Sequence, residues 1–197
     1  IIVKRKDTAA AWLLWHQDNT YNHVLRLPHT NTETDSASGR VGAFGSQGSS
    51  TIFTVFQGSS AYGNSYESGD EYIFWAWTEK QGYSKFGKYV GNGNADGPFV
   101  YTGFKPAWLF VKELDGDTSW GIWDNKRSPV NPADELILPN QSAPEYTGSS
   151  YNLDFLSNGF KLRNTDGAWN GTNDNYVFMA FAEHPFVTST KIPTTAR

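Results

Sequence analysis

The sequence predicts an all-β protein: a β-sandwich of the jelly-roll or concanavalin-like kind, built from two tandem repeated units. Three observations predict it. Aromatic residues make up 16% of the 197 residues and there are 19 glycines, and these residue types suit pleated strands and tight turns, respectively. No stretch of 11 or more residues follows the 3.6-residue period of an amphipathic helix, so helix should be scarce. The third observation is that the chain repeats itself.

The repeat is anchored by matches near both ends of each copy. The first set of matched residues is separated by 108 positions and the second set by 104. The pairs are Val3/Val111, Lys4/Lys112, Asp7/Asp115, Trp12/Trp120 and Trp15/Trp123, then Asp70/Asp174, Tyr72/Tyr176, Phe74/Phe178, Ala76/Ala180 and Glu79/Glu183. Because both sets occur in the same order, we interpret the chain as a duplication.

The repeat also sets the expected domain organisation. Residues 1–82 form the first repeat, and residues 83–197 form lead-in strands followed by the second repeat. We expect the two to make one compact body. Ile1 already lies within a predicted strand, so the first repeat is expected to be truncated at its N-terminal side.

Each copy reads as short strands separated by turn residues. The predicted strands are 1–5 and 108–114, 10–17 and 118–125, 23–27 and 135–139, 51–57 and 159–163, and 71–77 and 175–181. Residues 83–112 read as strand, loop, strand, tight turn and strand. The last strand of each copy is apolar on both faces, which predicts a central strand covered on both sides. The four matched tryptophans, at positions 12, 15, 120 and 123, are expected in the core.

Composition and charge exclude several classes of protein. The net charge is −4 and no basic stripe is visible, which argues against a nucleic-acid partner. No apolar run approaches the ~20 residues that span a bilayer, so membrane insertion is not expected. The absence of cysteine excludes disulfides, thiolate catalysis and cysteine-ligated zinc.

The glycine-rich run Gly91–Gly97, with the sequence GNGNADG, invites a comparison with phosphate-binding loops. It matches neither the dinucleotide fingerprint nor the P-loop pattern, and no predicted helix follows it. Asn and Gly readily adopt the positive φ values of tight turns. We therefore interpret the run as a joint that leads into the second repeat, without an activity of its own.

Calcium is the metal that the sequence favours most, although weakly. Asp115, Asp117, Asp166 and Asp174 could supply hard oxygen ligands. The EF-hand spacing is absent, and Asp-Gly is also what a tight turn requires. We predict no metal and no cofactor, with these four aspartates as the alternative.

No catalytic motif stands out. Glu79 and Glu183 occupy equivalent positions of the two repeats, which suits a structural role better than the facing carboxylate pair of a glycosidase. The nucleophile-elbow pattern GxSxG is absent. A Ser-His-Asp triad stays open, because its members meet only in the fold. We predict a protein that is not an enzyme.

Aromatic side chains in polar loops are the candidate binding residues. Trp169 lies in DGAWNGT next to Asn170, and Tyr62 and Tyr66 lie in AYGNSYES. An exposed ring can stack on a sugar while neighbouring amides bind hydroxyl groups. The alternative is that these rings fold back over the sandwich or pack against another subunit.

Three segments carry a resemblance to a known family: 83–112, 151–167 and 176–186. The first contains the pattern G-x-Y-x-GNG…GF-x-P-x-W, from Gly87 to Trp108. These segments resemble the virion structural proteins of bacteriophages, in particular domains of the tail-fibre kind. The resemblance is clear from Tyr83 onward and weaker over residues 1–79, where it depends on the repeat.

The resemblance implies a β-sandwich on the surface of an extracellular particle, as a module of a longer homotrimeric or otherwise homo-oligomeric fibre. Its partners would be other virion subunits and a glycan of the host surface. No catalytic residues accompany the pattern. The first hypothesis is a non-enzymatic tail-fibre or appendage domain that contacts the host. The alternatives are a purely structural capsid-surface or tail decoration module, and a carbohydrate-binding or depolymerase domain.

Overall fold

The structure is a computed structural model of the 197-residue chain. It describes residues 1–7, 9, 11–20, 23–27, 29–35, 69–184, 186–187 and 193–194. The chain divides into two compact units, unit 1 (Ile1–Trp77) and unit 2 (Thr78–Arg197). The boundary lies close to the expected end of the first repeat at residue 82.

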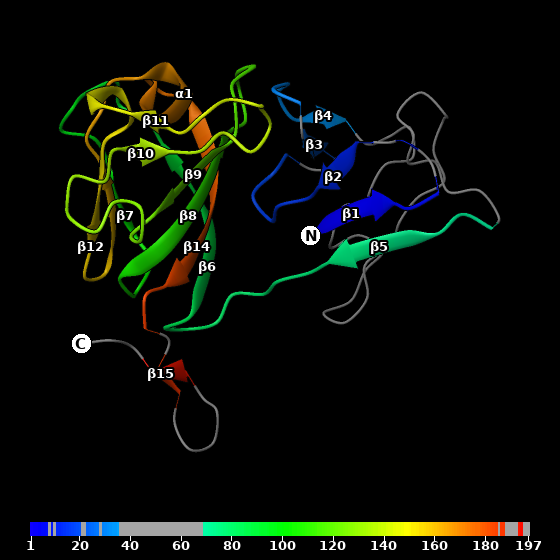
Figure 1. The fold of residues 1–197 in the computed structure, drawn as a ribbon, viewed down its shortest axis with the longest axis horizontal. Coiled ribbons are helices and arrows are strands. Elements are labelled where there is room, and N and C mark those ends of the chain that lie inside the picture. The colour runs from blue at the N-terminus through cyan, green and yellow to red at the C-terminus, as the bar shows by residue number, and fades with distance from the viewer. Residues whose placement is uncertain are drawn as a thin grey trace. The chain divides into compact units, whose positions relative to one another are not determined.

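The described strands of unit 1 form one antiparallel sheet (Figure 1). They are β1 (Ile2–Arg5), β2 (Trp12–Leu14), β3 (His23–Leu27), β4 (Thr34–Asp35) and β5 (Tyr72–Trp75), in the spatial order β4-β3-β2-β1-β5. The alternation of β1 and β2 turns Val3 and Leu13 inward, where they pack with Val24 of β3. Ile1, Trp15 and Tyr72 pack against this small core while staying partly exposed.

Unit 2 holds most of the described strands and the one α-helical turn found among the described residues. Its elements are β6 (Ser84–Val90), β7 (Phe99–Tyr101), β8 (Pro106–Glu113), β9 (Gly121–Asp124), β10 (Glu135–Leu136), β11 (Tyr146–Thr147), the 3-10 turn η2 (Ser149–Tyr151), β12 (Leu153–Leu156), β13 (Gly159–Leu162), α1 (Gly167–Asn170), β14 (Asn175–Ala182), β15 (Phe186–Val187) and β16 (Pro193–Thr194). Two of its sheets have the orders β6-β14-β8-β9 and β12-β13-β7. The pairs β10-β11 and β15-β16 are two-stranded.

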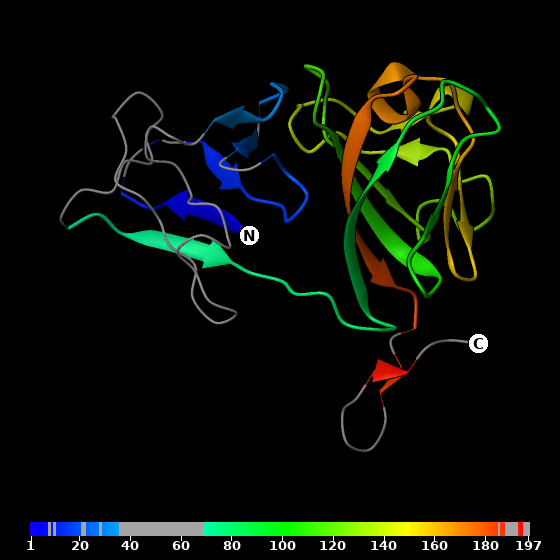
Figure 2. The same ribbon diagram turned by 180° about the vertical axis from the view of Figure 1, so that it is seen from behind.

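The two larger sheets of unit 2 lie on opposite sides of one core, so this unit is a β-sandwich (Figures 1 and 2). Phe160 of β13 bridges them: its ring centroid is 5.9 Å from that of Tyr89 and 5.3 Å from that of Phe178, both of the other sheet. Each contact is edge-to-face, the arrangement that aromatic quadrupoles favour. The all-β sandwich predicted from the sequence is confirmed.

The pairing registers of unit 1 recur in unit 2. Ile2 pairs with Leu14 and with Trp75 in unit 1. The residues at the expected offsets, Phe110, Ile122 and Met179, pair in the same way. The pairs His23↔Asp35 and Glu135↔Thr147 also correspond, with a common offset of 112. The tandem repeat stays a prediction, and these shared registers are the observation that supports it.

The last strand of each copy is predicted to be central and covered on both faces. The prediction is correct for β14, but the predicted burial is wrong for β5. β14 lies between β6 and β8, and Val177 and Phe178 on its two faces are each 3% exposed. β5 pairs with β1 alone among the described strands, and Ile73 and Trp75 are 42% and 37% exposed. The same apolar pattern therefore ends up central in unit 2 and at the edge of the described sheet in unit 1.

The lead-in segment has the predicted order of strands. Residues 83–112 contain β6, a loop, β7, a turn and β8, as predicted. Trp120 and Trp123 are buried, as predicted, whereas Trp12 and Trp15 are only partly buried. Residues 51–57 lie outside the described residues.

The predicted loop around Trp169 is instead the helical turn α1. Among the described residues, no helix has both the length and the apolar character needed to cross a membrane.

Candidate functional site

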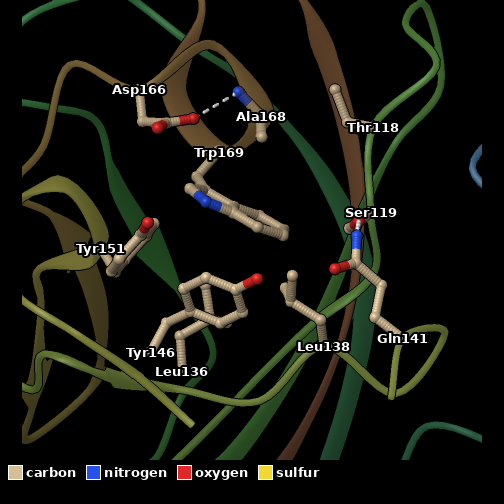
Figure 3. A pocket seen from close by; sticks show the side chains of 10 residues that line it. All are labelled: Thr118, Ser119, Leu136, Leu138, Gln141, Tyr146, Tyr151, Asp166, Ala168 and Trp169. Atoms are coloured by element: carbon tan, nitrogen blue, oxygen red, sulfur yellow. Dashed lines mark hydrogen bonds between the residues drawn. The ribbon is translucent and has the colours of Figure 1, made fainter. Parts of the chain in front are cut away.

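The candidate site is a small cavity of about 230 Å³ in unit 2 (Figure 3). Three aromatic side chains and two leucines supply its apolar wall, and polar side chains lie at its margin. The lining residues are Thr118, Ser119, Leu136, Leu138, Gln141, Tyr146, Tyr151, Asp166, Ala168 and Trp169. They come from the turn before β9, the segment from β10 to η2, and α1.

Trp169 forms one wall of this cavity, in a different setting from the one predicted. The expectation of an exposed loop aromatic is wrong, because Trp169 is 2% exposed. Its ring meets Trp123 edge-to-face, with centroids 5.0 Å apart. Gly121 makes room for both rings, since a Cβ there would lie 2.6 Å from Trp123 and 2.7 Å from Trp169. Figure 3 shows the indole directed into the space between Tyr146, Tyr151 and Leu138.

Hydrogen bonds fix the helical turn that carries Trp169. Asp166 caps it, with Oδ1 accepting from the backbone N–H of Ala168 at 2.8 Å. The hydroxyl of Tyr89 donates to the carbonyl of Trp169 at 2.8 Å. The hydroxyl of Tyr176 accepts from the N–H of Gly171 at 2.8 Å and donates to the carbonyl of Gly167.

The two tyrosines that hold α1 support each other. The rings of Tyr89 and Tyr176 are stacked, with centroids 4.9 Å apart and planes 11° apart. Burial raises the pKa of both hydroxyls above the ordinary value. Because a raised pKa keeps each hydroxyl protonated, both remain hydrogen-bond donors toward α1 over the ordinary pH range. The position of Trp169 therefore depends both on nearby residues and on Tyr89, which lies 80 residues earlier in the sequence.

The prediction that Asn170 binds a ligand is also wrong, because its side-chain amide is buried and already hydrogen-bonded within the chain. The residue is 0% exposed. Its Oδ1 accepts from the N–H of Asn92 at 2.9 Å, and its Nδ2 donates to the carbonyls of Asn94 at 2.8 Å and Asn164 at 2.6 Å. The amide therefore ties the glycine-rich loop 91–97 to the α1 segment.

The glycine-rich loop is a packing element in this structure. The N–H of Gly93 donates to the carbonyl of Asn170 at 2.8 Å. A Cβ on Gly91 would lie 2.1 Å from the carbonyl oxygen of Gly171. A side chain at position 91 would thus collide with the backbone of the neighbouring loop. The interpretation of this run as a joint agrees with these contacts.

The margin of the cavity supplies hydrogen-bonding groups. Ser119 Oγ accepts from Gln141 Nε2 at 2.6 Å, which positions the Gln141 amide at the entrance. Tyr146 and Tyr151 meet edge-to-face at 5.8 Å. Within the described part of the chain, the Tyr146 hydroxyl makes no hydrogen bond. The cavity thus combines an aromatic wall with polar groups that could bind hydroxyls.

The pattern that predicts Trp169 as a binding residue also applies to Tyr146 and Tyr151, which are not among the predicted binding residues. Tyr146 and Tyr151 lie in the segment 139–151, which is rich in Pro, Ser, Gly and Asn. The rule of an aromatic in a polar loop applies to both. Of the other predicted binding residues, Tyr62 and Tyr66 lie outside the described residues.

The four calcium candidates do not form a metal-binding group in the described part of the chain. Asp115 Oδ2 accepts from the N–H and the side-chain amide of Asn175, at 2.6 and 2.8 Å. Asp166 caps α1. Asp174 packs beside Gly171, and Asp117 lies in the turn between β8 and β9. Over the described residues, no group of three or more His, Asp or Glu side chains could hold a metal ion.

The two glutamates matched by the repeat each have a cationic partner. Glu79 Oε1 lies 2.6 Å from Lys85 Nζ. Glu183 Oε2 lies 2.8 Å from Lys105 Nζ, and its Oε1 accepts from Asn125 at 2.7 Å. The hydrogen bond from Lys105 lowers the pKa of Glu183. These contacts agree with the structural role predicted for the pair.

Comparison with known proteins identifies a family. Residues 1–185 match the family described as a domain of unknown function (DUF7483). No curated protein matches the chain, and neither does a solved structure. Because the match extends across both units, this chain belongs to the DUF7483 family.

Proposed function

We propose that this chain is a non-enzymatic virion domain that binds one sugar residue of a host-surface glycan in the cavity beside α1. The observation that carries the glycan proposal is the combination of the partly exposed rings of Tyr146 and Tyr151, backed by the buried Trp169, with the polar margin of the cavity. A sugar ring has an apolar C–H face and a rim of hydroxyls. An aromatic wall and nearby amide and carboxylate groups complement both parts.

The size of the cavity favours a single sugar residue. Its 230 Å³ is below the roughly 300–1,000 Å³ of pockets that enclose drug-sized ligands. We expect weak binding at one site, with a dissociation constant on the order of 1 mM. A homotrimeric or other homo-oligomeric fibre presents several copies, and multivalency then raises the avidity by a factor of about 10²–10⁴.

The virion part of the proposal is supported by the sequence resemblance from Tyr83 onward. It predicts that the domain lies on the outer surface of a phage particle, in contact with other virion subunits. Labelling of intact particles with an antibody against this chain tests it. Label at the tail tip supports a role in host contact. Label along the capsid or tail shaft supports a decoration module, and no label on particles contradicts both.

A purely structural module is the second candidate, and one observation favours it. Unit 1 exposes several large apolar side chains on and after β5. These are Ile73 at 42%, Phe74 at 54%, Trp75 at 37% and Trp77 at 41% exposure. Exposed aromatic residues of this kind are enriched at protein interfaces. In this proposal the surface packs on neighbouring subunits, and the domain serves assembly without contacting the host.

A polysaccharide depolymerase is the third candidate. It would need two carboxylates about 5–9.5 Å apart at the bound sugar. Asp166 is the only carboxylate among the ten residues that line the cavity, and one of its oxygens already caps α1. The cavity therefore favours binding over hydrolysis.

Binding of the labelled chain to host cells tests the sugar site. Tyr146→Ala removes an aromatic wall, and Gln141→Ala removes a polar group at the exposed margin. Tyr83→Ala is the matched control, because Tyr83 is 43% exposed and does not line the cavity. We expect both cavity variants to lose binding and the control to keep it. Equal binding by the wild type, Tyr146→Ala, Gln141→Ala and Tyr83→Ala would refute the proposed sugar site.

A further inference from the structure

A second aromatic surface lies on the sheet β12-β13-β7 of unit 2. On β7, Phe99 is 45% exposed and Tyr101 62% exposed, whereas Val100 between them is 7% exposed. Alternate residues of a strand face the same side, so the two rings share the solvent face. They are separated by about 7 Å along the strand. β7 is the edge strand in the order β12-β13-β7 of the described strands.

The neighbouring strand lets the rings lie along the sheet. Gly159 of β13 pairs with Tyr101. A Cβ at Gly159 would lie 2.9 Å from Cε2 and 3.0 Å from Cζ of Phe99. The far end of the Phe99 ring therefore extends over Gly159. The result is a shallow apolar strip on the sheet surface, which we call the β7 strip (Phe99, Tyr101 and Gly159).

Charged side chains border the β7 strip in balanced numbers. Lys161 pairs with Phe99 in the sheet register, and its Nζ lies 2.7 Å from Asp96 Oδ1. Arg163 Nε lies 2.7 Å from Asp154 Oδ2. An ammonium has three N–H donors and a guanidinium five, so these ion pairs leave donors unused. The border can therefore bind hydroxyls without carrying a net charge.

We propose that the β7 strip binds an uncharged polysaccharide chain. The rings would pack on the C–H faces of successive sugar residues, and Lys161 and Arg163 would donate to their hydroxyls. Two cations matched by two carboxylates give no attraction for an anionic chain. The inference rests on the proposed function in taking a glycan as the ligand, and extends it from one sugar residue in a cavity to a chain along a sheet.

Electrophoresis of the full chain through gels containing a polysaccharide tests the inference. The probes are three uncharged polymers, a β-glucan, a mannan and a galactan, with heparin as the anionic comparison. Phe99→Ala and Tyr101→Ala should each weaken retardation by an uncharged polymer roughly tenfold. Tyr101→Phe keeps the ring and should stay close to wild type, and Tyr83→Ala is the control.

The outcomes separate this inference from the proposed function. Loss of retardation in both β7 variants, but not in Tyr83→Ala, supports the β7 strip. Loss in Tyr146→Ala alone overturns the inference and leaves the cavity proposal standing. Loss of retardation in Phe99→Ala and Tyr101→Ala, with unchanged retardation of Tyr146→Ala, supports the β7 strip and contradicts the cavity proposal. No retardation by any uncharged polymer, or retardation by heparin alone, overturns the inference. So does loss of self-association in the β7 variants without polysaccharide binding, which would identify the strip as a protein contact.

Discussion

Replacing Asn170 with alanine should destabilise the fold strongly, because one side chain joins two loops of unit 2. The substitution removes three hydrogen bonds, of 2.9 Å from Asn92 and of 2.8 and 2.6 Å to Asn94 and Asn164. Asn92 and Asn94 are exposed, so water can replace their lost partner. Each of these two bonds then accounts for only the ordinary net value of roughly 0.5–1.5 kcal/mol.

The hydrogen bond to the carbonyl of Asn164 contributes most to the expected loss of stability. Asn164 is 2% exposed, and a buried carbonyl left without a donor costs about 1–3 kcal/mol. The total is about 2–6 kcal/mol, a large part of the roughly 5–15 kcal/mol that stabilises a typical domain. Urea unfolding followed by tryptophan fluorescence measures it. The matched control is Asn158→Ala, at an exposed turn position, with an expected change of about 0.5 kcal/mol or less. A loss below about 1 kcal/mol for Asn170→Ala would refute this account of the loop.

Three further substitutions test other parts of the structure. Gly91→Ala places a Cβ 2.1 Å from a backbone oxygen and should destabilise by roughly 1–3 kcal/mol; Gly167→Ala, with open space around it, should be neutral or slightly stabilising in the same urea assay. Tyr89→Phe removes the donor to the Trp169 carbonyl and should lower stability by about 1–2 kcal/mol, measured by thermal unfolding. Lys112→Met removes a buried ammonium whose pKa burial lowers from 10.5 to about 8. Since the folded pKa lies below the unfolded one, wild-type stability should rise by about 2 kcal/mol relative to this variant between pH 8 and pH 10.

Each of these expectations has an outcome that contradicts it. Equal stability of the Gly91 and Gly167 variants would show that the loops do not approach each other as described. An unchanged melting temperature for Tyr89→Phe would show that this hydroxyl does not hold α1. Parallel stability curves for wild type and Lys112→Met from pH 8 to pH 10 would show that Lys112 is solvated in the folded chain.

The sequence predicts strands better than their places in a sheet. β5 and β14 share an apolar pattern that predicts burial on both faces, yet only β14 lies between two described strands. Its second neighbour is β6, which belongs to the lead-in segment and not to the repeated pattern. Burial of a strand depends on its place in the sheet and on which elements pack against its two faces, and local composition does not contain that information.

The candidate site shows a similar limit. Trp169 lines the cavity, but as a buried ring and not as the exposed loop aromatic that the sequence predicts. A polar, glycine-rich sequence suggested an exposed ring, whereas Tyr89, 80 residues away, holds the turn against the core. Asn170 looked like a surface ligand group, and its amide instead joins segments that no local pattern connects. Long-range hydrogen bonds to the backbone leave no signal in a single sequence.

A glycan array probed with the wild-type chain and with Tyr146→Ala tests the central claim most directly. The claim is that the cavity bounded by Trp169, Tyr146 and Tyr151 binds a sugar residue. It predicts that wild type binds a set of glycans that share one terminal sugar, and that Tyr146→Ala loses this set while remaining folded. Binding of the same glycans by both proteins, or of none by wild type at a multivalent density, would contradict it.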